Sequence, residues 1–364
     1  MSDSRRTYRA IQSKLVQIQG YPSGRVLQRT TVLAAYIAGI VRSKSTQGRK
    51  VAEQSGMRSK VESRIKRLER WYQNEQIEYE LDYLPYLSEL LDNLADVPWV
   101  LAIDGSEIGR GCMALMINLV YEKRSIPLAW VVFQRPKGHA SAAEHIELIE
   151  QVLKILPEEQ QIIFLGDGEF DSIELQERIC AIEGWDYVCR TAKNTTVYSD
   201  GERLTPEGIA ILPDMTLSLT DVLVTEEQFG PIHLALVWDH ECDEPLFLVT
   251  SFEVAEEAYY WYQRRMRIET FFSDQKSRGF GLDKCHVSDP KRLSRILIAA
   301  SLAYLWMLYL GVQAHLNQMV AVIHRTDRCD LSLFQLGLAL LQHFLNESMT
   351  IDVDFRLHRD FLLA

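Results

Sequence analysis

Residues 97–106, VPWVLAIDGS, mark the point at which the chain changes from a helical to an extended pattern. The apolar run 99–103 is short enough for a buried strand, and it ends at Asp104. Two further apolar runs follow, at 113–121 and 126–133, with turn residues between them. These three runs predict three consecutive strands, which fix the class of fold that follows.

Helical and extended patterns then alternate. We predict a helix over 142–156, a strand over 161–165, a helix over 172–183 and a strand over 186–191. The resulting order is β-β-β-α-β-α-β. This order is typical of a ribonuclease-H-like domain, an α/β fold with a mixed five-stranded sheet and flanking helices.

Two aspartates follow predicted strands in this unit. Asp104 comes just after the first strand, and Asp167 just after the fourth. In a ribonuclease-H-like domain these strands are adjacent and parallel, so the two carboxylates are expected to converge. Either residue alone would more often be a loop or helix-cap residue, and it is their joint placement at matching strand ends that points to a site. Other acidic residues nearby are Glu107, Glu169 and Asp171, of which Asp171 is better interpreted as the N-cap of the next helix.

A third carboxylate is needed, because Mg²⁺ prefers oxygen ligands and paired ions need more than two carboxylates. The segment 262–276, YQRRMRIETFFSDQK, supplies a candidate. On one ideal helix Tyr262, Arg265, Glu269 and Lys276 would form a stripe roughly 60° wide. A solvated charged face with an Arg265–Glu269 pair remains the alternative.

The spacing Tyr, two residues, Arg, three, Glu, six, Lys resembles the signature of the insertion-sequence-four family of DDE transposases. Other stretches carry the same resemblance, which spans most of residues 30–312: LAIDGS at 101–106, QRPKGH at 134–139, LGDGEFDS at 165–172, YVCRTAKN at 187–194 and RGFGL at 278–282.

The resemblance implies that Asp104, Asp167 and Glu269 form a catalytic triad that binds two Mg²⁺ ions, for which Mn²⁺ can substitute. It implies that Tyr262, Arg265 and Lys276 contact the phosphates of the transposon end. The implied activity is cut-and-paste transposition: strand cleavage at the terminal inverted repeats, by way of a hairpin, and strand transfer into target DNA. Two ends must be held together, which implies a homodimer in the synaptic complex.

Residues 195–251 are β-rich and separate Asp167 from Glu269. We predict that they form an insertion domain between two parts of the catalytic core, residues 97–194 and 252–312. By the family resemblance, an aromatic residue of such an insertion holds a flipped base. Trp238 is the first candidate and Trp261 the second, although core packing is the alternative for each. Arg190 and Lys193 are expected to contact the same DNA, and residues 313–364 form a helical tail.

The amino-terminal part of the chain is strongly basic. Residues 1–70 contain sixteen Lys or Arg and four Asp or Glu, a net charge of +12 in a chain whose total is −11. Predicted helices at 31–42, 48–54 and 58–72 suggest a helix-turn-helix. We therefore expect residues 1–75 to bind DNA through Lys60, Arg64 and Arg67, with salt-dependent affinity, and residues 76–96 to form an acidic connector.

Several features exclude other classes of protein. The six cysteines have no zinc-clip spacing, and the first residues lack a secretory signal, so a cytoplasmic location is expected. The apolar run 296–312 is interpreted as a buried core helix, with no membrane partner. Two alternatives remain from sequence: a catalytically silent DNA-binding inhibitor of transposition, and a structure-selective nuclease on the same fold.

Overall fold

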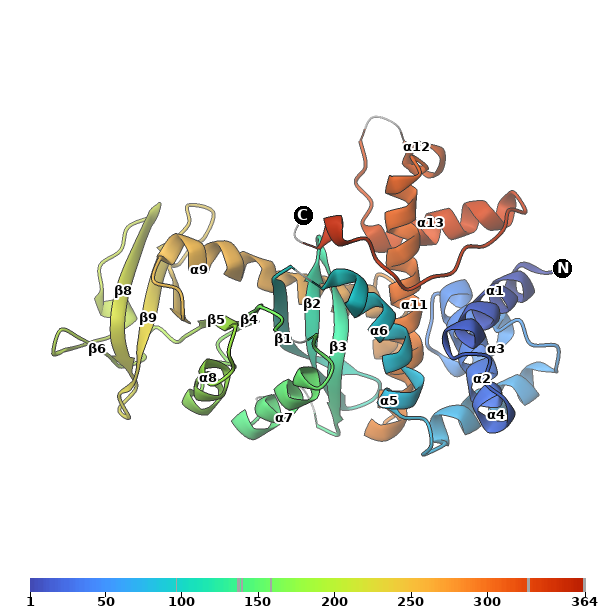
Figure 1. The fold of residues 1–364 in the computed structure, drawn as a ribbon, viewed down its shortest axis with the longest axis horizontal. Helices are drawn as coiled ribbons and strands as arrows, with labels where there is room; N and C mark the ends of the chain where they lie inside the picture. Colours follow the sequence, from blue (N-terminus) through green and yellow to red (C-terminus); the bar gives the residue numbers. More distant parts are fainter. Residues whose placement is uncertain (96, 136–137, 139, 158, 326–327, 363–364) are drawn as a thin grey trace.

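The computed structural model describes residues 1–362 except 96, 136–137, 139, 158 and 326–327. The chain is elongated, and helices from both of its ends gather at one end of the molecule (Figure 1). Strands occupy the middle and the opposite end. The chain is mixed α/β, as the sequence predicts.

Four helices form the basic amino-terminal unit: α1 (Asp3–Ile18), α2 (Gly24–Ser43), α3 (Gly48–Gln54) and α4 (Val61–Gln73). Helix α2 begins before the predicted start because its first residues, which include the apolar Val26 and Leu27, are exposed and show no sustained apolar stripe. Helix α4 begins later than predicted, since Lys60 has an extended backbone. Helix α1 was not predicted; it buries Tyr8, Ile11 and Leu15.

The acidic connector is helical and packs on the sheet. It contains α5 (Tyr79–Asp82) and α6 (Leu84–Leu94), and Pro85 lies in the first turn of α6, where its missing N–H costs nothing. The hydroxyls of Tyr79 and Tyr83 donate to the carbonyls of Leu128 and Pro127, at 2.5 and 2.6 Å. These bonds attach the connector to the third strand.

The strands of the described residues form one mixed sheet in the order β3-β2-β1-β4-β5-β10-β9-β8-β6-β7. Their bounds are β1 (Trp99–Ile108), β2 (Cys112–Tyr121), β3 (Arg124–Phe133), β4 (Ile162–Gly166), β5 (Trp185–Arg190), β6 (Val197–Ser199), β7 (Glu202–Leu204), β8 (Met215–Val224), β9 (Phe229–Trp238) and β10 (Leu246–Thr250).

The first five strands have the predicted directions. Strands β1, β2 and β3 are antiparallel neighbours, and β1, β4 and β5 are parallel neighbours. The predicted end of the first strand was wrong, however. Strand β1 continues to Ile108 because it pairs with β2 as far as Cys112, so Asp104 lies within the strand, opposite Met116.

The strands of residues 195–251 extend this same sheet. Strand β10 pairs antiparallel with β5 on one side and with β9 on the other, and β8 continues beyond β9. Backbone hydrogen bonds therefore connect the β-rich insertion to the core. This connection sets the position of β9, and hence of Trp238, relative to the end of β5.

Helices cover both faces of the sheet. Helix α7 (Ala142–Leu153) contacts β2 and β3. Figure 1 shows α8 (Ile173–Cys180) below β4 and β5 and α9 (Ala255–Tyr262) above them. Helix α10 (Arg267–Gln275) contacts β1, β2 and β3, and α11 (Pro290–Leu316) contacts β3. Short 3-10 turns lie at Pro206–Gly208, Gln263–Met266, Leu282–Lys284 and Arg359–Phe361.

Helix α11 is the core helix expected from the apolar run. It is long and apolar enough to cross a bilayer, but 89 % of its most apolar window is buried inside the protein. The tail contributes α12 (Val320–Ile323) and α13 (Leu333–Asn346), and α13 packs directly on α11. Gly337 permits this packing, because a Cβ there would lie 1.9 Å from the carbonyl oxygen of Met307.

Candidate active site

Asp104 and Asp167 occupy equivalent positions on neighbouring parallel strands. The β1–β4 register pairs Ala102 with Leu165, and each aspartate is the second residue beyond this pair. Strand β4 ends at Gly166, so Asp167 is the first residue after it. The two aspartates therefore share one edge of the sheet, although only Asp167 follows the end of its strand.

A tight turn after β4 holds Asp167. The backbone N–H of Glu169 donates to Oδ1 of Asp167 at 3.0 Å, and that of Phe170 donates to its carbonyl at 3.0 Å. Gly166 is required for this turn, since a Cβ there would lie 2.5 Å from Cβ of Phe170. Asp104 is 7 % exposed, and its Oδ1 accepts from the N–H of Gly105 at 2.7 Å.

Asp171 does not cap the following helix, contrary to the interpretation of the sequence. Ser172 is the N-cap of α8 and accepts a hydrogen bond from the backbone N–H of Leu175. Asp171 instead accepts a 2.7 Å bond from the hydroxyl of Thr191. Both residue types favour N-caps, and the helix begins one residue later than Asp171 would allow.

The segment 262–276 is not one continuous α-helix, so the predicted stripe was wrong in detail. Helix α9 ends at Tyr262, and the 3-10 turn that follows carries Arg265. Glu269 lies on α10, and Lys276 follows the last residue of that helix. The tighter turn changes the angular spacing of these side chains, because it has three residues per turn instead of 3.6.

Arg265 lies between the carboxylates. Its Nη2 is 3.0 Å from Oε1 of Glu269, and its Nη1 is 3.9 Å from Oδ2 of Asp104. The Arg265 side chain is 11 % exposed. Burial opposes its charge, but nearby acidic groups outweigh that effect and raise the pKa of Arg265; these groups are Tyr262, Asp104, Asp167 and Glu269.

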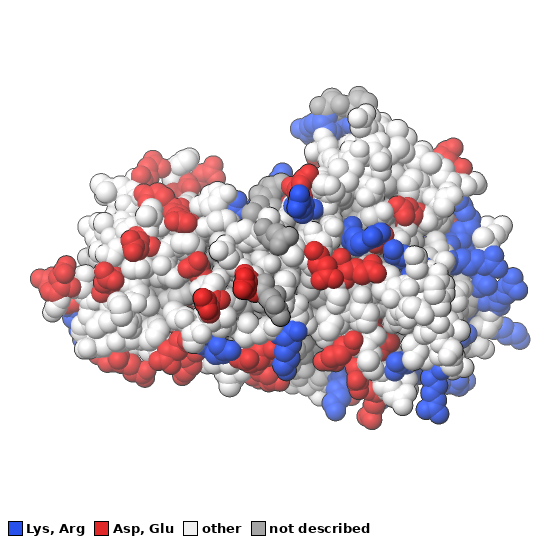
Figure 2. All heavy atoms as spheres, in the orientation of Figure 1, with Lys and Arg blue, Asp and Glu red and all other residues white. Residues whose placement is uncertain are grey.

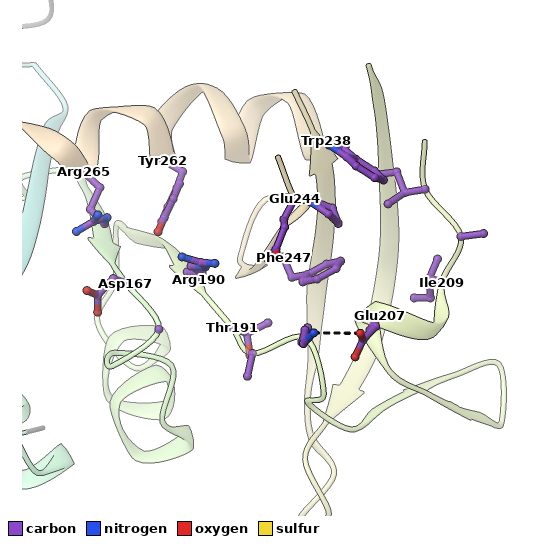
Figure 3. Close-up of a pocket in the computed structure, with 16 residues that line it drawn as sticks. Asp167, Arg190, Thr191, Glu207, Ile209, Trp238, Glu244, Phe247, Tyr262 and Arg265 are labelled. Atoms are coloured by element: carbon purple, nitrogen blue, oxygen red, sulfur yellow. Dashed lines mark hydrogen bonds and ion pairs between the residues drawn. The ribbon is translucent and has the colours of Figure 1, made fainter. Parts of the chain in front are cut away.

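The three carboxylates are thus arranged around a guanidinium. Within the described part of the chain, no three Asp, Glu, His or Cys residues lie close enough together to hold a metal ion as they stand. The positive charge at this edge of the sheet comes from Arg265. The structure brings Asp104 and Glu269 to the same side chain, whereas Asp167 faces it from the turn after β4 (Figure 3).

Tyr262 and Lys276 lie on either side of Arg265 in the sequence and differ in their surroundings. Burial raises the pKa of Tyr262 to about 12, against the opposing effect of Arg265, so its hydroxyl stays protonated at neutral pH and can donate a hydrogen bond. The Nζ of Lys276 donates to Oγ of Ser106 at 2.5 Å. This bond ties the end of α10 to β1, two residues beyond Asp104.

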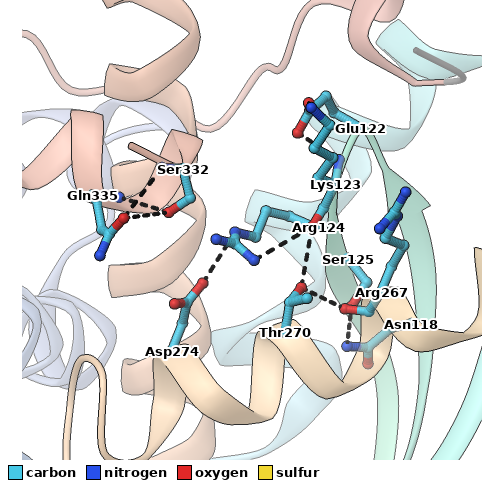
Figure 4. Close-up of polar contacts among 10 residues, drawn as sticks. All are labelled: Asn118, Glu122, Lys123, Arg124, Ser125, Arg267, Thr270, Asp274, Ser332 and Gln335. Atoms are coloured by element: carbon cyan, nitrogen blue, oxygen red, sulfur yellow. Dashed lines mark hydrogen bonds and ion pairs between the residues drawn. The ribbon is translucent and has the colours of Figure 1, made fainter. Parts of the chain in front are cut away.

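A polar network holds α10, and with it Glu269, against the β2–β3 hairpin (Figure 4). The hydroxyl of Thr270 donates to the carbonyl of Lys123 at 3.2 Å, and that of Ser125 to the carbonyl of Arg267 at 3.2 Å. Nε of Arg124 lies 3.3 Å from Oδ2 of Asp274. The carboxylate on α10 is therefore positioned by a hairpin whose strand β2 pairs with β1, the strand that carries Asp104.

Residues 96–306 match the family described as the transposase DDE domain. The match covers more than half of the chain and includes all three carboxylates. The chain belongs to this family. A comparison with curated proteins finds no match. One similar solved structure is the cryo-EM structure of the piggyBac transposase synaptic complex with hairpin DNA, with a TM-score of 0.44 and 13 % identity over 95 % of this chain and 80 % of that chain. That similarity is too low to carry a conclusion about this transposase.

A pocket of about 630 Å³ opens beside Asp167 in this DDE transposase (Figure 3). It extends from Asp167 and Arg265 to Trp238 and Phe247 on β9 and β10. Six of the residues singled out from the sequence line it: Asp167, Arg190, Lys193, Trp238, Tyr262 and Arg265. Aromatic and cationic side chains therefore share one cavity next to Asp167.

The two candidate tryptophans differ in position. Trp238 lines the pocket, and its Nε1 donates to the carbonyl of Cys242 at 3.1 Å. Trp261 is not among the lining residues. It packs edge-on against Tyr260, with ring centroids 4.9 Å apart, and the guanidinium of Arg264 lies 4.0 Å from the Tyr260 ring. Trp238 is the better placed of the two for a ligand beside Asp167.

The three basic amino-terminal residues singled out from the sequence also differ in their surroundings. Lys60, the N-cap residue of α4, and Arg67, within that helix, are both exposed. Arg64 instead donates from Nε to the carbonyl of Ser59 at 2.6 Å and from Nη1 to that of Ala52 at 3.3 Å. These bonds make Arg64 a cap for the end of α3. Lys and Arg gather over the amino-terminal helices, whereas Asp and Glu dominate the end with β8 and β9 (Figure 2).

Sequence reasoning missed several residues of this site. Ser106 accepts a hydrogen bond from Lys276. It is the last residue of LAIDGS and follows Asp104 by two positions, so the strand periodicity places both side chains on the same face of β1. Phe247 lines the pocket but reads in the sequence as an ordinary strand residue. Arg124 and Asp274 are 150 residues apart, and no local pattern indicates that they pair.

Proposed function

We propose that this chain is a cut-and-paste transposase of the insertion-sequence-four family. The observation that carries the proposal is the placement of Asp104, Asp167 and Glu269 around the guanidinium of Arg265. Asp104 and Asp167 hold equivalent positions on adjacent parallel strands, and Glu269 shares the guanidinium of Arg265 with Asp104. The Tyr262–Lys276 spacing supports the finer family assignment.

We further propose that strands β1–β5 and their helices form a ribonuclease-H-like core. The strand order β3-β2-β1-β4-β5, with three antiparallel strands followed by two parallel ones, supports it. In this proposal residues 195–251 are an insertion that contributes the far side of the pocket, and residues 1–75 are the DNA-binding domain.

Asp104, Asp167 and Glu269 would hold two Mg²⁺ ions, or Mn²⁺ in their place. The donor chemistry fits, because all three residues offer hard carboxylate oxygens. A bound ion would have to displace or share the charge of Arg265, which pairs with Asp104 and Glu269. When bound, such ions would activate water and neutralise charge on the phosphate under attack. No covalent enzyme intermediate is part of this proposal.

The side chains around the carboxylates would hold the DNA end. Tyr262 donates from a protonated hydroxyl, and Arg265 and Lys276 supply charge to the phosphates. Arg190 and Lys193 line the adjoining pocket, where Trp238 offers a ring on which a flipped base can stack. A hairpin on the transposon end, formed while that base is held, is part of the proposal.

The partners follow from the reaction. The substrate would be DNA with terminal inverted repeats, followed by target DNA, and two ends held together require a homodimer. The protein would act on DNA in the cytoplasm of a prokaryotic cell. These statements rest on the reaction proposed above.

A supercoiled plasmid that carries the DNA flanking the coding region on both sides tests the proposal. Incubation with Mg²⁺ or Mn²⁺ is expected to give nicks at the boundaries of the inverted repeats, and then joined products. Binding without any nick would identify a silent DNA-binding protein. Nicks without joined products would identify a nuclease. A metal-free sample with EDTA is the matched control.

A further inference from the structure

A groove of about 530 Å³ lies between α2 and α4, far in the sequence from the three carboxylates. Helix α2 contributes Arg25 and Arg29, and helix α4 contributes Arg67 and Arg70. The remaining lining residues are Gln28, Val32, Trp71, Asn74 and Gln76. Four arginines therefore line one groove that contains no carboxylate.

The arginines are largely unneutralised. Arg25, Arg67 and Arg70 are exposed, and none of them makes an ion pair with another described residue. Arg29 is the exception: its Nε lies 3.9 Å from Asp82, and its Nη1 donates to the carbonyl of Gln76. Because each pair is spaced three or four residues apart on its helix, its members lie on one side of that helix.

Trp71 also lines this groove, and its indole N–H is without a partner among the described residues. The residue is 4 % exposed and packs edge-on against Tyr36, at 5.7 Å between ring centroids. Its indole Nε1 is buried and has no hydrogen-bond partner in the described structure. Buried polar groups normally have a partner, so this N–H calls for an acceptor that the protein does not provide.

We propose that this groove binds a phosphate of the DNA backbone. Unpaired guanidinium groups and an unsatisfied N–H together lack an anionic acceptor, and arginine is well suited to phosphate oxygens. Duplex DNA is favoured over a small phosphate because the groove is open and lies in a unit with a net charge of +12. The inference rests on the proposed function. It adds DNA contacts from α2, a helix for which the sequence predicted none.

Fluorescence anisotropy of a 40-bp mixed-sequence duplex, titrated with the full-length protein at several NaCl concentrations, tests the groove. The double variant R25Q/R70Q is expected to lower the slope of log Kobs against log[NaCl] by about 2, because two phosphate contacts are lost. R9Q/R49Q removes the same charge from exposed positions outside the groove and is expected to lower it by less than about 0.5. An equal effect of the two pairs would overturn the proposal.

Two further arms separate the possible ligands. W71F keeps the aromatic packing and removes the N–H, so we expect about three- to tenfold weaker DNA binding with an unchanged slope. Binding equal to wild type would remove Trp71 from the site. Inorganic pyrophosphate, at matched ionic strength, is expected to leave the Tm of wild type and R25Q/R70Q equally unaffected. A pyrophosphate response lost in R25Q/R70Q, with an unchanged DNA slope, would assign the groove to small phosphates instead.

These assays use no metal and no transposon end. A wild-type protein that fails to nick the plasmid would therefore contradict the transposase proposal and leave the groove intact. If R25Q/R70Q has the same salt slope as wild type and the wild type nicks the plasmid, the phosphate site in the groove is contradicted and the transposase proposal is not.

Discussion

The guanidinium of Arg265 lies 3.0 Å from the carboxylate of Glu269, one helical turn later in the chain. The same guanidinium approaches Asp104 at 3.9 Å, and its side chain is almost fully buried. A carboxylate on α10 and one on β1 are therefore joined by a cation at the place proposed for metal ions. Cations that bind there must compete with Arg265.

Arg265→Gln is expected to strengthen Mg²⁺ binding about tenfold or more. A unit charge about 4 Å from a carboxylate contributes on the order of 1 to 4 kcal/mol, and the substitution removes it. The measurement is the rise in Tm on titration with Mg²⁺, taken relative to each variant without metal. Arg264→Gln, whose guanidinium lies over Tyr260 instead, is the matched control. Identical Mg²⁺ responses in the two variants would contradict the competition.

Asp104→Asn, Asp167→Asn and Glu269→Gln should each reduce plasmid nicking by at least about 10³-fold. Each change removes a charged ligand, and metal-assisted charge stabilisation contributes several kcal/mol to such reactions. DNA binding measured by anisotropy should remain within about twofold of wild type. Glu107→Gln and Glu169→Gln, nearby acidic residues, serve as controls and should keep nicking. Nicking retained by one of the three variants would remove that residue from the triad.

Asp274 should give the protein a pH-dependent stability. Burial raises its pKa to about 6, despite the opposing effects of Arg124 and Arg278. A raised pKa means that the folded state binds the proton more tightly, so this contribution is complete below about pH 4 and is lost as the pH rises through 6. The loss should be on the order of 2 to 3 kcal/mol.

The difference in unfolding free energy between wild type and Asp274→Asn, measured in urea from pH 4.5 to 7.5, isolates this effect. The variant should become more stable relative to wild type as the pH rises, because asparagine cannot ionise. Asp283→Asn, at an exposed aspartate on the following 3-10 turn, is the matched control. A difference for Asp274→Asn that stays constant with pH would contradict the raised pKa of its carboxyl.

Trp238→Ala should separate the first nick from later steps. A stacked base contributes roughly 1 to 3 kcal/mol, so hairpin products are expected to fall about tenfold or more while the initial nick is retained. Denaturing gels of end-labelled DNA measure both products. Trp238→Phe keeps a ring in the pocket and should recover part of the loss. If Trp261→Ala causes the selective defect and Trp238→Ala does not, the base-binding residue is Trp261.

Local patterns were sufficient for much of the fold. Alternating and continuous apolar runs predicted β2, β3, β4 and β5, and the long apolar run predicted the buried helix α11. These predictions succeeded because side-chain periodicity reports which face of an element is buried. Element ends were less reliable: β1 extends past Asp104 because its partner β2 is long enough to pair with it.

The sequence by itself was enough to single out Asp104, Asp167 and Glu269 as candidates, the aspartates by their place after predicted strands and Glu269 by the family resemblance. Only the tertiary structure decided what surrounds them. The 3-10 turn at Gln263–Met266 aims Arg265 at Asp104, and the pairing of β10 with β5 brings Trp238 to the pocket beside Asp167. Likewise, Arg64 caps the end of α3. Helices α2 and α4 together form the groove lined by four arginines. Such arrangements depend on contacts between distant residues, which no local pattern in a single sequence encodes.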